Sequence, residues 1–277
     1  MAYEEVWFPA RDGLKLHGWF IPAPSEGGVT PKNITIIAGH GHTSNKEPDL
    51  EYASFFYRAG YNVFMFDFRG HGQSEGPRGT SLGYWERLDV HGAVDWLLGR
   101  GQTLFAAFGI SMGAAIMIMG AAENPFIRAV VADSPYAHLR YSIAAEINNA
   151  YHIPMWLARP LSRYAWAIFA RYHGLPAGQA NPADYVAALA PRPLFIIHGE
   201  SDQLTRVENA YILFEMAGWP RELWTQPGVT HAQSFIVFGK EYEQRVLAFL
   251  DKVDWETPLD LKAPTRTLEG FKVGQFD

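Results

Sequence analysis

Short apolar runs alternate along the chain with segments whose apolar residues recur every three or four positions. The runs are rich in β-branched and aromatic residues, as expected for buried strands. They lie at 33–38, 61–67, 105–108, 129–133 and 193–198. Helical spacing follows several of them, for example at Tyr52, Phe55, Phe56 and Ala59. Strands that alternate with helices predict βαβ units, and therefore an α/β fold with a mostly parallel, doubly wound sheet.

The first residues do not follow this alternation. Residues 3–21 are predicted to form an antiparallel hairpin, with strands at 3–9 and 14–21 joined by a turn at 11–13. Near the other end, 222–225 is predicted to be a short strand, and a last helix follows it.

A long middle stretch, residues 134–189, contains no strand-like run and is rich in alanine, aromatic residues and arginine. Pro154, Pro160 and Pro176 are expected to divide it into short helices. We interpret the stretch as a helical cap inserted over the carboxyl edge of the sheet, with ordinary crossover helices as the alternative. The expected organisation is a core domain of residues 1–133 and 190–253, a cap of residues 134–189, and a carboxyl-terminal tail of residues 254–277.

Composition narrows the possible partners. The net charge is −6 and no basic block is present, so nucleic acid is not an expected partner. The chain has no cysteine, which excludes disulfides and thiolate chemistry. The first residues lack the basic and apolar regions of a signal peptide, and no apolar stretch is long enough to span a bilayer. We therefore expect a cytoplasmic protein; the sequence leaves its oligomeric state open.

The most informative motif is Gly109-Ile110-Ser111-Met112-Gly113. Gly-x-Ser-x-Gly alone is a weak signal, but here it lies between a strand and a helix, which is typical of a nucleophile elbow. Glycines allow the strand and the helix to approach closely at such a strained turn. Ser111 is therefore the candidate nucleophile, and a serine that only fits a tight turn is the alternative.

A serine hydroxyl needs a neighbouring base, and the base needs an acid to orient it. His231 lies in the loop after the last predicted strand, from which it can reach the elbow. Asp202 follows the strand at 193–198 at the same edge, so the chain order is nucleophile, acid, base. Asp133 is the main alternative acid and Glu200 a weaker one. Asp202 could also be a turn-forming residue that caps the next helix.

An oxyanion hole needs two backbone N–H groups. The amide of Met112 lies at the amino end of the helix after the elbow, where the helix dipole favours negative charge. The second donor is predicted to be the amide of His42, with Thr43 as the second choice. His40, His42, Asp67 and His71 could instead suggest a metal site, but no spacing among them is characteristic of one. We expect neither a metal nor an organic cofactor.

Together these motifs resemble the α/β-hydrolase superfamily. The resemblance rests on His40-Gly41, on the Asp67–Ser74 loop, on Gly109–Gly113, and on Asp202 and His231. The chain is most similar to bacterial serine hydrolases near the monoacylglycerol lipases, serine aminopeptidases and small esterases that have a short helical cap. The resemblance implies the α/β-hydrolase fold and serine-hydrolase chemistry without a cofactor, and it implies that the Asp67–Ser74 loop is structural.

The expected function is therefore hydrolysis of a small carboxylic ester through an acyl-enzyme. Aromatic and methionine residues of the cap favour a substrate with an apolar acyl or alcohol part, and Thr43, Tyr136 and Trp156 are the candidate pocket residues. The same serine, histidine and aspartate would serve a peptidase, an amidase or a thioesterase; a peptidase could use Glu146 as the anchor for a free amine. A non-catalytic binding protein that kept the fold is the remaining alternative.

Overall fold

The computed structural model describes residues 1–24, 28–175 and 181–257. No helix in these ranges is both long and apolar enough to span a bilayer. The predicted strand at 222–225 is present and extends over Arg221–Gln226. Of the predicted tail, only residues 254–257 belong to the described part of the chain.

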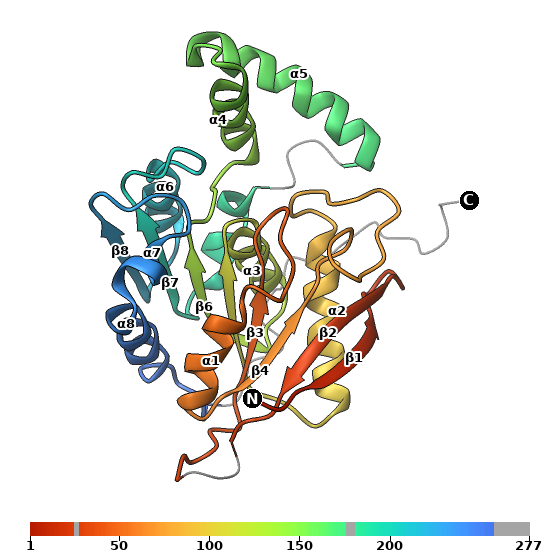
Figure 1. The fold of residues 1–277 in the computed structure, drawn as a ribbon, viewed down its shortest axis with the longest axis vertical. Helices are drawn as coiled ribbons and strands as arrows, with labels where there is room; N and C mark the ends of the chain where they lie inside the picture. Colours follow the sequence, from red (N-terminus) through yellow and green to blue (C-terminus); the bar gives the residue numbers. More distant parts are fainter. Residues whose placement is uncertain (25–27, 176–180, 258–277) are drawn as a thin grey trace.

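One sheet of eight strands organises the molecule (Figure 1). Its order is β1-β2-β4-β3-β5-β6-β7-β8, and the first two strands form the predicted antiparallel hairpin. β2 also pairs antiparallel with β4, whereas the neighbours from β4 to β8 are parallel. The mostly parallel sheet and the hairpin predicted from the sequence are therefore confirmed. The strands are β1 (Glu4–Pro9), β2 (Lys15–Ile21), β3 (Thr35–Gly39), β4 (Asn62–Phe66), β5 (Phe105–Ile110), β6 (Ile127–Asp133), β7 (Leu194–Gly199) and β8 (Arg221–Gln226).

Helices cover both faces of the sheet. Apolar side chains of α2, α3 and α6 pack in the core on one face, and those of α1 and α8 pack in the core on the other. Two short 3-10 helices and Tyr185 between them also contribute to the first of these cores, through Ala183, Tyr185, Val186 and Leu189. The helices are α1 (Leu50–Arg58), α2 (Glu86–Gly99), α3 (Met112–Glu123), α4 (Leu139–Tyr151), α5 (Met155–His173), α6 (Glu208–Met216), α7 (Ser234–Phe238) and α8 (Lys240–Leu250), with 3-10 helices at Pro182–Asp184 and Val186–Leu189.

β5 lies at the centre of the sheet, between β3 and β6, and every one of its residues is buried. Phe105 and Ala107 face one core, and Ala106, Phe108 and Ile110 face the other. This alternation explains why the strand reads as a continuous apolar run: both faces of a covered parallel sheet are dry. The residue that follows β5 is Ser111, so the candidate nucleophile stands at the carboxyl edge of the central strand.

α4 and α5 form a helical hairpin that stands above this carboxyl edge (Figure 1). Pro160 was expected to end a helix, but α5 runs through it for 19 residues. The prediction of a helix break at Pro160 is therefore wrong. A proline within a helix removes the hydrogen bond to the carbonyl four residues earlier, here that of Trp156. Trp156 lies in the exposed first turn, where water can satisfy this carbonyl.

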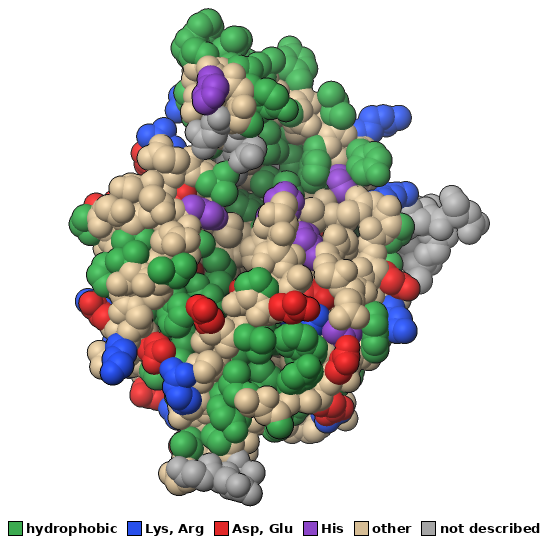
Figure 2. Space-filling view, viewed as in Figure 1, with side chains coloured by type: hydrophobic (Ala, Val, Ile, Leu, Met, Phe, Trp, Pro, Cys, Tyr) green, Lys and Arg blue, Asp and Glu red, His purple; other side chains and the backbone are tan. Residues whose placement is uncertain are grey.

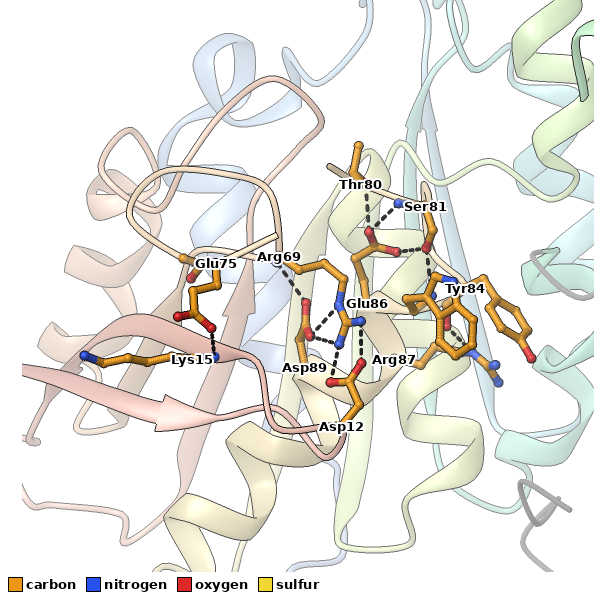
Figure 3. Close-up of polar contacts among 12 residues, drawn as sticks. Asp12, Lys15, Arg69, Glu75, Thr80, Ser81, Tyr84, Glu86, Arg87 and Asp89 are labelled. Carbon is orange, nitrogen blue, oxygen red and sulfur yellow. Dashed lines mark hydrogen bonds and ion pairs between the residues drawn. The ribbon is translucent and has the colours of Figure 1, made fainter. Parts of the chain in front are cut away.

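The loop between β4 and α2 forms part of the same edge and is braced by buried ion pairs (Figure 3). The Arg69 guanidinium donates to both carboxylate oxygens of Asp12 at 2.8 and 2.9 Å, and its Nε donates to Asp89 at 2.8 Å. Farther along, the Glu86 carboxylate accepts hydrogen bonds from the hydroxyls of Thr80 and Ser81. These contacts fix the loop, and they support a structural role for the residues around Arg69.

Candidate active site

Ser111 occupies a strained turn between β5 and α3. Its backbone has φ 55° and ψ −116°, a conformation that is costly for a residue with a side chain. The turn is tight: a Cβ on Gly109 would lie 2.5 Å from the Gly113 carbonyl carbon, and a Cβ on Gly113 would collide with the carbonyl oxygen of Gly39. The Ser111 amide donates to the Asp133 carbonyl at 2.8 Å, which anchors the turn to β6. The two glycines are therefore required by backbone packing.

Hydrogen bonds connect Ser111, His231 and Asp202, which come from the ends of three different strands. The Ser111 hydroxyl lies 2.8 Å from His231 Nε2, and His231 Nδ1 lies 2.6 Å from Asp202 Oδ2. A carboxylate only accepts hydrogen bonds, so Nδ1 carries the proton and Nε2 is free to accept from the serine hydroxyl. The structure thus brings together the three residues that the sequence singled out, in the arrangement that activates a serine.

The Asp202 carboxylate is buried but well supplied with donors. Its Oδ1 accepts from the amides of Leu204 at 2.8 Å and Thr205 at 2.9 Å, and its Oδ2 accepts from the Thr205 hydroxyl at 2.9 Å. His198 Nε2 lies 3.4 Å from the same Oδ2. Burial alone would raise the pKa of Asp202, but hydrogen bonds from His198, His231 and the Thr205 amide hold the pKa well below its usual range. Asp202 is therefore ionised, which agrees with its candidate role as the acid that orients His231.

The sequence did not single out Thr205 or His198 for this role. We call the hydrogen-bonded set Ser111, His231 and Asp202 the relay. The Thr205 hydroxyl also lies 3.0 Å from His231 Nδ1, so it contacts both His231 and Asp202. His198 Nε2 donates to the Thr205 carbonyl at 2.5 Å and so holds the loop in place. The only signal in the sequence is the spacing of Asp202 and Thr205, which suits an aspartate turn in which the carboxylate accepts from amides farther along the chain.

The two alternative acids have other partners. Asp133 Oδ2 accepts from the Tyr242 hydroxyl at 3.0 Å, and its Oδ1 accepts from Ser134 Oγ at 2.9 Å. Its complete burial raises the pKa of Asp133 above the usual value. Glu200 is exposed and accepts from Thr225 Oγ1 at 2.8 Å. The carboxylate hydrogen-bonded to His231 is that of Asp202.

The loop after β3 passes close to the elbow. A Cβ on Gly41 would lie 3.6 Å from the Ser111 Cβ, so the backbone at Gly41 lies against the serine. His40 is buried and fixes this loop: its Nδ1 donates to the Gly41 carbonyl at 2.7 Å, and its Nε2 accepts from the Phe68 amide at 3.0 Å. Burial lowers the pKa of His40 to about 4, so the ring is neutral. Because both ring nitrogens are engaged, His40 is poorly suited to bind a metal.

The predicted oxyanion donors flank this point. Met112 is the first residue of α3, and His42 directly follows Gly41. The assignment of their amides to an oxyanion hole stays a prediction. Thr43, the second choice for this role, is exposed and adopts a positive φ of 59°.

The predicted pocket residues lie in different surroundings. Thr43 is on the exposed loop just described. Tyr136 is 3% exposed; its hydroxyl donates to the Leu82 carbonyl, and its ring lies in a buried cluster with Leu139 at the start of α4. Trp156 lies on α5 with 76% of its surface exposed. The side chain of Glu146 lies outside the described part of the chain. The assignment of Thr43, Tyr136 and Trp156 to substrate binding stays a prediction.

A cavity of about 630 Å³ lies between the α4–α5 hairpin and the start of α6. Apolar side chains of Met155, Leu204 and Ile212 line it together with Arg159 and Arg163. It adjoins the Asp202 loop, because Leu204 lines it and the amide of Leu204 donates to Asp202. Its volume is in the range of small-molecule sites.

Similar proteins and structures are known for nearly the whole chain. The family model described as serine aminopeptidase, S33, matches residues 30–170. The uncharacterized protein YfhR of Escherichia coli K12 is 30% identical over 253 residues, which cover 89% of this chain and 80% of YfhR. The uncharacterized protein YqkD of Bacillus subtilis 168 is 29% identical, over 90% of this chain and 79% of YqkD. The solved structure of the Pyrococcus furiosus esterase Pf2001 matches with a TM-score of 0.73 and 30% identity, over 92% of each chain.

Proposed function

Because this chain belongs to the serine aminopeptidase S33 family of α/β hydrolases, we propose that it hydrolyses small carboxylic esters with Ser111 as nucleophile. The observation that carries the proposal is the continuous hydrogen-bonded path from the Ser111 hydroxyl through His231 to Asp202. The similarity to an esterase, Pf2001, favours an ester over other acyl compounds.

The reaction follows from the geometry. His231 Nε2 accepts the hydroxyl proton as Ser111 Oγ attacks the ester carbonyl carbon, and a tetrahedral oxyanion forms. The imidazolium then donates this proton to the leaving alkoxide, so that an alcohol leaves and an acyl-serine remains. Water attacks the acyl carbon while His231 takes its proton; the carboxylic acid is released and Ser111 regains its hydrogen. Asp202 stabilises the imidazolium in both halves of the reaction.

The oxyanion would be held by the amides of Met112 and His42. The first lies at the amino end of α3, where the helix dipole adds to the hydrogen bond. The second lies in the loop that His40 fixes against Ser111. Each such donor contributes about 3–4 kcal/mol of transition-state stabilisation in comparable sites. The chemistry uses no cofactor.

The substrate would carry an apolar acyl or alcohol part. The support is the cavity next to the Asp202 loop, where Met155, Leu204 and Ile212 provide apolar surface and half of the lining residues are apolar. The family description favours a second candidate, an aminopeptidase, because the same relay can cleave an amide.

The cytoplasmic location of the protein also stays a prediction.

The experiment compares Ser111→Ala with Ser201→Ala, a serine on the same edge of the sheet, using p-nitrophenyl butyrate and a fluorophosphonate probe. We expect Ser111→Ala to lose at least 10³-fold in kcat/KM and all labelling, whereas Ser201→Ala keeps both (the magnitude is on the order of a lost nucleophile). Near-wild-type turnover by Ser111→Ala would refute the proposal.

A second comparison separates ester from peptide chemistry. The purified protein is given p-nitrophenyl esters and aminoacyl p-nitroanilides at matched concentrations. Faster turnover of the esters supports the proposal, and preferential cleavage of anilides with a free amino group would favour the aminopeptidase instead.

A further inference from the structure

The outward face of α5 carries an unusual stripe of exposed apolar side chains. Its members recur every three or four residues, so they lie on one side of the helix. They are Leu157, Leu161, Tyr164, Ile168 and Tyr172, and their exposed fractions are 39%, 40%, 72%, 72% and 64%. We call this set the outer stripe. Figure 2 shows hydrophobic side chains gathered over α4 and α5, at the top of the molecule.

The outer stripe is not the face with which α5 packs on the rest of the protein. That role belongs to Ala158, Ser162 and His173, which are at most 6% exposed. At about 100° per residue, this buried face lies on the opposite side of the helix from Tyr164 and Ile168. α5 therefore has one face that packs on the rest of the protein and, on another side, an apolar stripe that the described residues leave exposed.

The charge of α5 is the opposite of that of the whole chain. The helix contains Arg159, Arg163 and Arg171 and no aspartate or glutamate. The complete chain has a net charge of −6. A basic helix with tyrosine, isoleucine and leucine on its exposed face has the composition of a segment that lies in the interface of a membrane.

This charge pattern distinguishes between possible occupants of the outer stripe. A second copy that paired α5 with α5 would bring two arginine-rich helices together, and like charges oppose such pairing. A surface of anionic lipids would instead attract the arginines while its acyl region accepts the apolar side chains. Tyrosine and tryptophan suit such an interface because their rings are apolar and their edges polar, and Trp156 precedes the stripe with 76% of its surface exposed.

We propose that the outer stripe of α5 docks the protein reversibly on anionic lipid surfaces. The helix would lie parallel to the surface, with Tyr164 and Ile168 inserted and Arg171, on the same side of the helix, at the level of the phosphates. This proposal does not depend on the catalytic assignment, because a protein with an inactive Ser111 would dock equally well.

The experiment measures co-sedimentation of the full-length protein with vesicles of phosphatidylcholine alone or mixed with phosphatidylglycerol. Tyr164→Ser/Ile168→Ser removes two side chains of the stripe, and both are largely exposed, so the fold should tolerate the change. Arg171→Gln removes charge only, at a residue that does not line the cavity beside α6. The matched control is Tyr211→Ser/Met216→Ser, because these side chains of α6 are each 44% exposed.

We expect the wild type to bind the anionic vesicles and to be released by salt. The serine double variant should bind at least tenfold more weakly, in line with the roughly 1.5–3 kcal/mol that each buried apolar side chain contributes. Arg171→Gln should bind roughly fivefold more weakly to anionic vesicles, since one arginine near such a surface contributes about 1 kcal/mol. The α6 control should bind as the wild type does, and all variants should hydrolyse a water-soluble ester at the wild-type rate.

Three results would overturn the proposal. Wild-type protein that does not sediment with the anionic vesicles is the first, and unchanged binding by Tyr164→Ser/Ile168→Ser is the second. The third is light scattering that shows a wild-type dimer which the serine double variant converts to a monomer, without vesicle binding, because a second copy would then cover the stripe. A chain that ends at Thr257 is measured in parallel; binding by this shorter chain alone would mean that residues 258–277 cover the stripe, and would equally refute docking by the full-length protein.

Discussion

Asp202→Asn separates the charge of this side chain from its shape. Asparagine keeps the volume of aspartate, so the loop around Leu204 and Thr205 can persist. The side chain, however, loses its negative charge and gains an NH₂ donor. In the wild-type protein, Asp202 Oδ2 lies 2.6 Å from His231 Nδ1 and selects the form of the ring that has its proton there.

The expected fall in kcat follows from the contact between Asp202 and His231. When the amide NH₂ of the asparagine faces Nδ1, that nitrogen must accept, so the ring proton moves to Nε2. Nε2 lies 2.8 Å from the Ser111 hydroxyl and can then no longer take its proton. We expect kcat to fall roughly 10³- to 10⁴-fold, with little change in KM. This fall corresponds to about 4–5.5 kcal/mol of transition-state stabilisation.

The assay is steady-state hydrolysis of p-nitrophenyl butyrate, with circular dichroism to verify the fold. Asp133→Asn is the matched control, because Asp133 ends the neighbouring strand and its carboxylate contacts Tyr242 and Ser134 instead of the histidine. We expect Asp133→Asn to retain activity to within about tenfold, since no hydrogen bond to the imidazole is lost. If Asp202→Asn were as active as Asp133→Asn, the assignment of the acid would be wrong.

The same variant predicts a change in the pH dependence of stability. Burial raises the pKa of Asp202, but hydrogen bonds from His198, His231 and the Thr205 amide lower it further, so its folded-state pKa lies below its unfolded value. Such a group contributes stability above the unfolded pKa of about 3.9, and this stability is lost as the pH falls below that value. Thermal unfolding at pH 7 and at pH 3 should therefore show a smaller acid-induced loss of Tm in Asp202→Asn than in the wild type. An equal loss in both proteins would contradict the lowered pKa.

Three further changes test the surroundings of the relay. Thr205→Val removes a hydroxyl that touches both Asp202 and His231, so kcat/KM should fall roughly 10- to 100-fold, as for a lost hydrogen bond to a charged group, while Thr205→Ser should stay close to wild type in the same kinetic assay. Gly113→Ala would drive a Cβ into the Gly39 carbonyl oxygen, and urea unfolding should show a loss of about 3 kcal/mol or more; a stable variant would contradict the close packing. Lys46→Met leaves the buried carboxylate of Asp67 without its cation at 2.8 Å, so calorimetry should show a destabilisation of about 3–5 kcal/mol, and an unchanged Tm would refute this.

The sheet and the positions of the candidate residues could be predicted because parallel strands end at one edge. Ser111, Asp202 and the loop of His231 each follow a strand, so the sequence placed them on a common edge before any contact was known. The choice between Asp133 and Asp202 was harder, since both follow neighbouring parallel strands. Their hydrogen-bond partners differ because Tyr242 reaches Asp133 from α8, a contact between residues 109 positions apart that no local pattern encodes.

Three other features could not be predicted from the sequence: the role of Thr205, the continuous helix at Pro160 and the exposure of the outer stripe. The role of Thr205 depends on how its loop folds back on Asp202, and many threonines lie near an aspartate. Pro160 suggested a break because the lost hydrogen bond is costly in a buried helix, but the first turn of α5 is exposed. The exposure of the outer stripe could not be predicted, since apolar periodicity shows that a face is apolar but not what covers it.

One serine, Ser134 in the loop after β6, contacts the loops after β7 and β8 that carry Asp202 and His231. Ser134 is fully buried; its carbonyl oxygen lies 3.1 Å from the Thr205 hydroxyl oxygen, and its Oγ accepts from the Ala232 amide at 3.2 Å. Its own amide donates to the Ile197 carbonyl at 2.9 Å. Ser134 thus connects the segments that carry the candidate acid and base, at the point where the chain continues towards α4. Substitutions on the exposed faces of α4 and α5 can therefore alter which molecules bind there without moving His231 relative to Ser111.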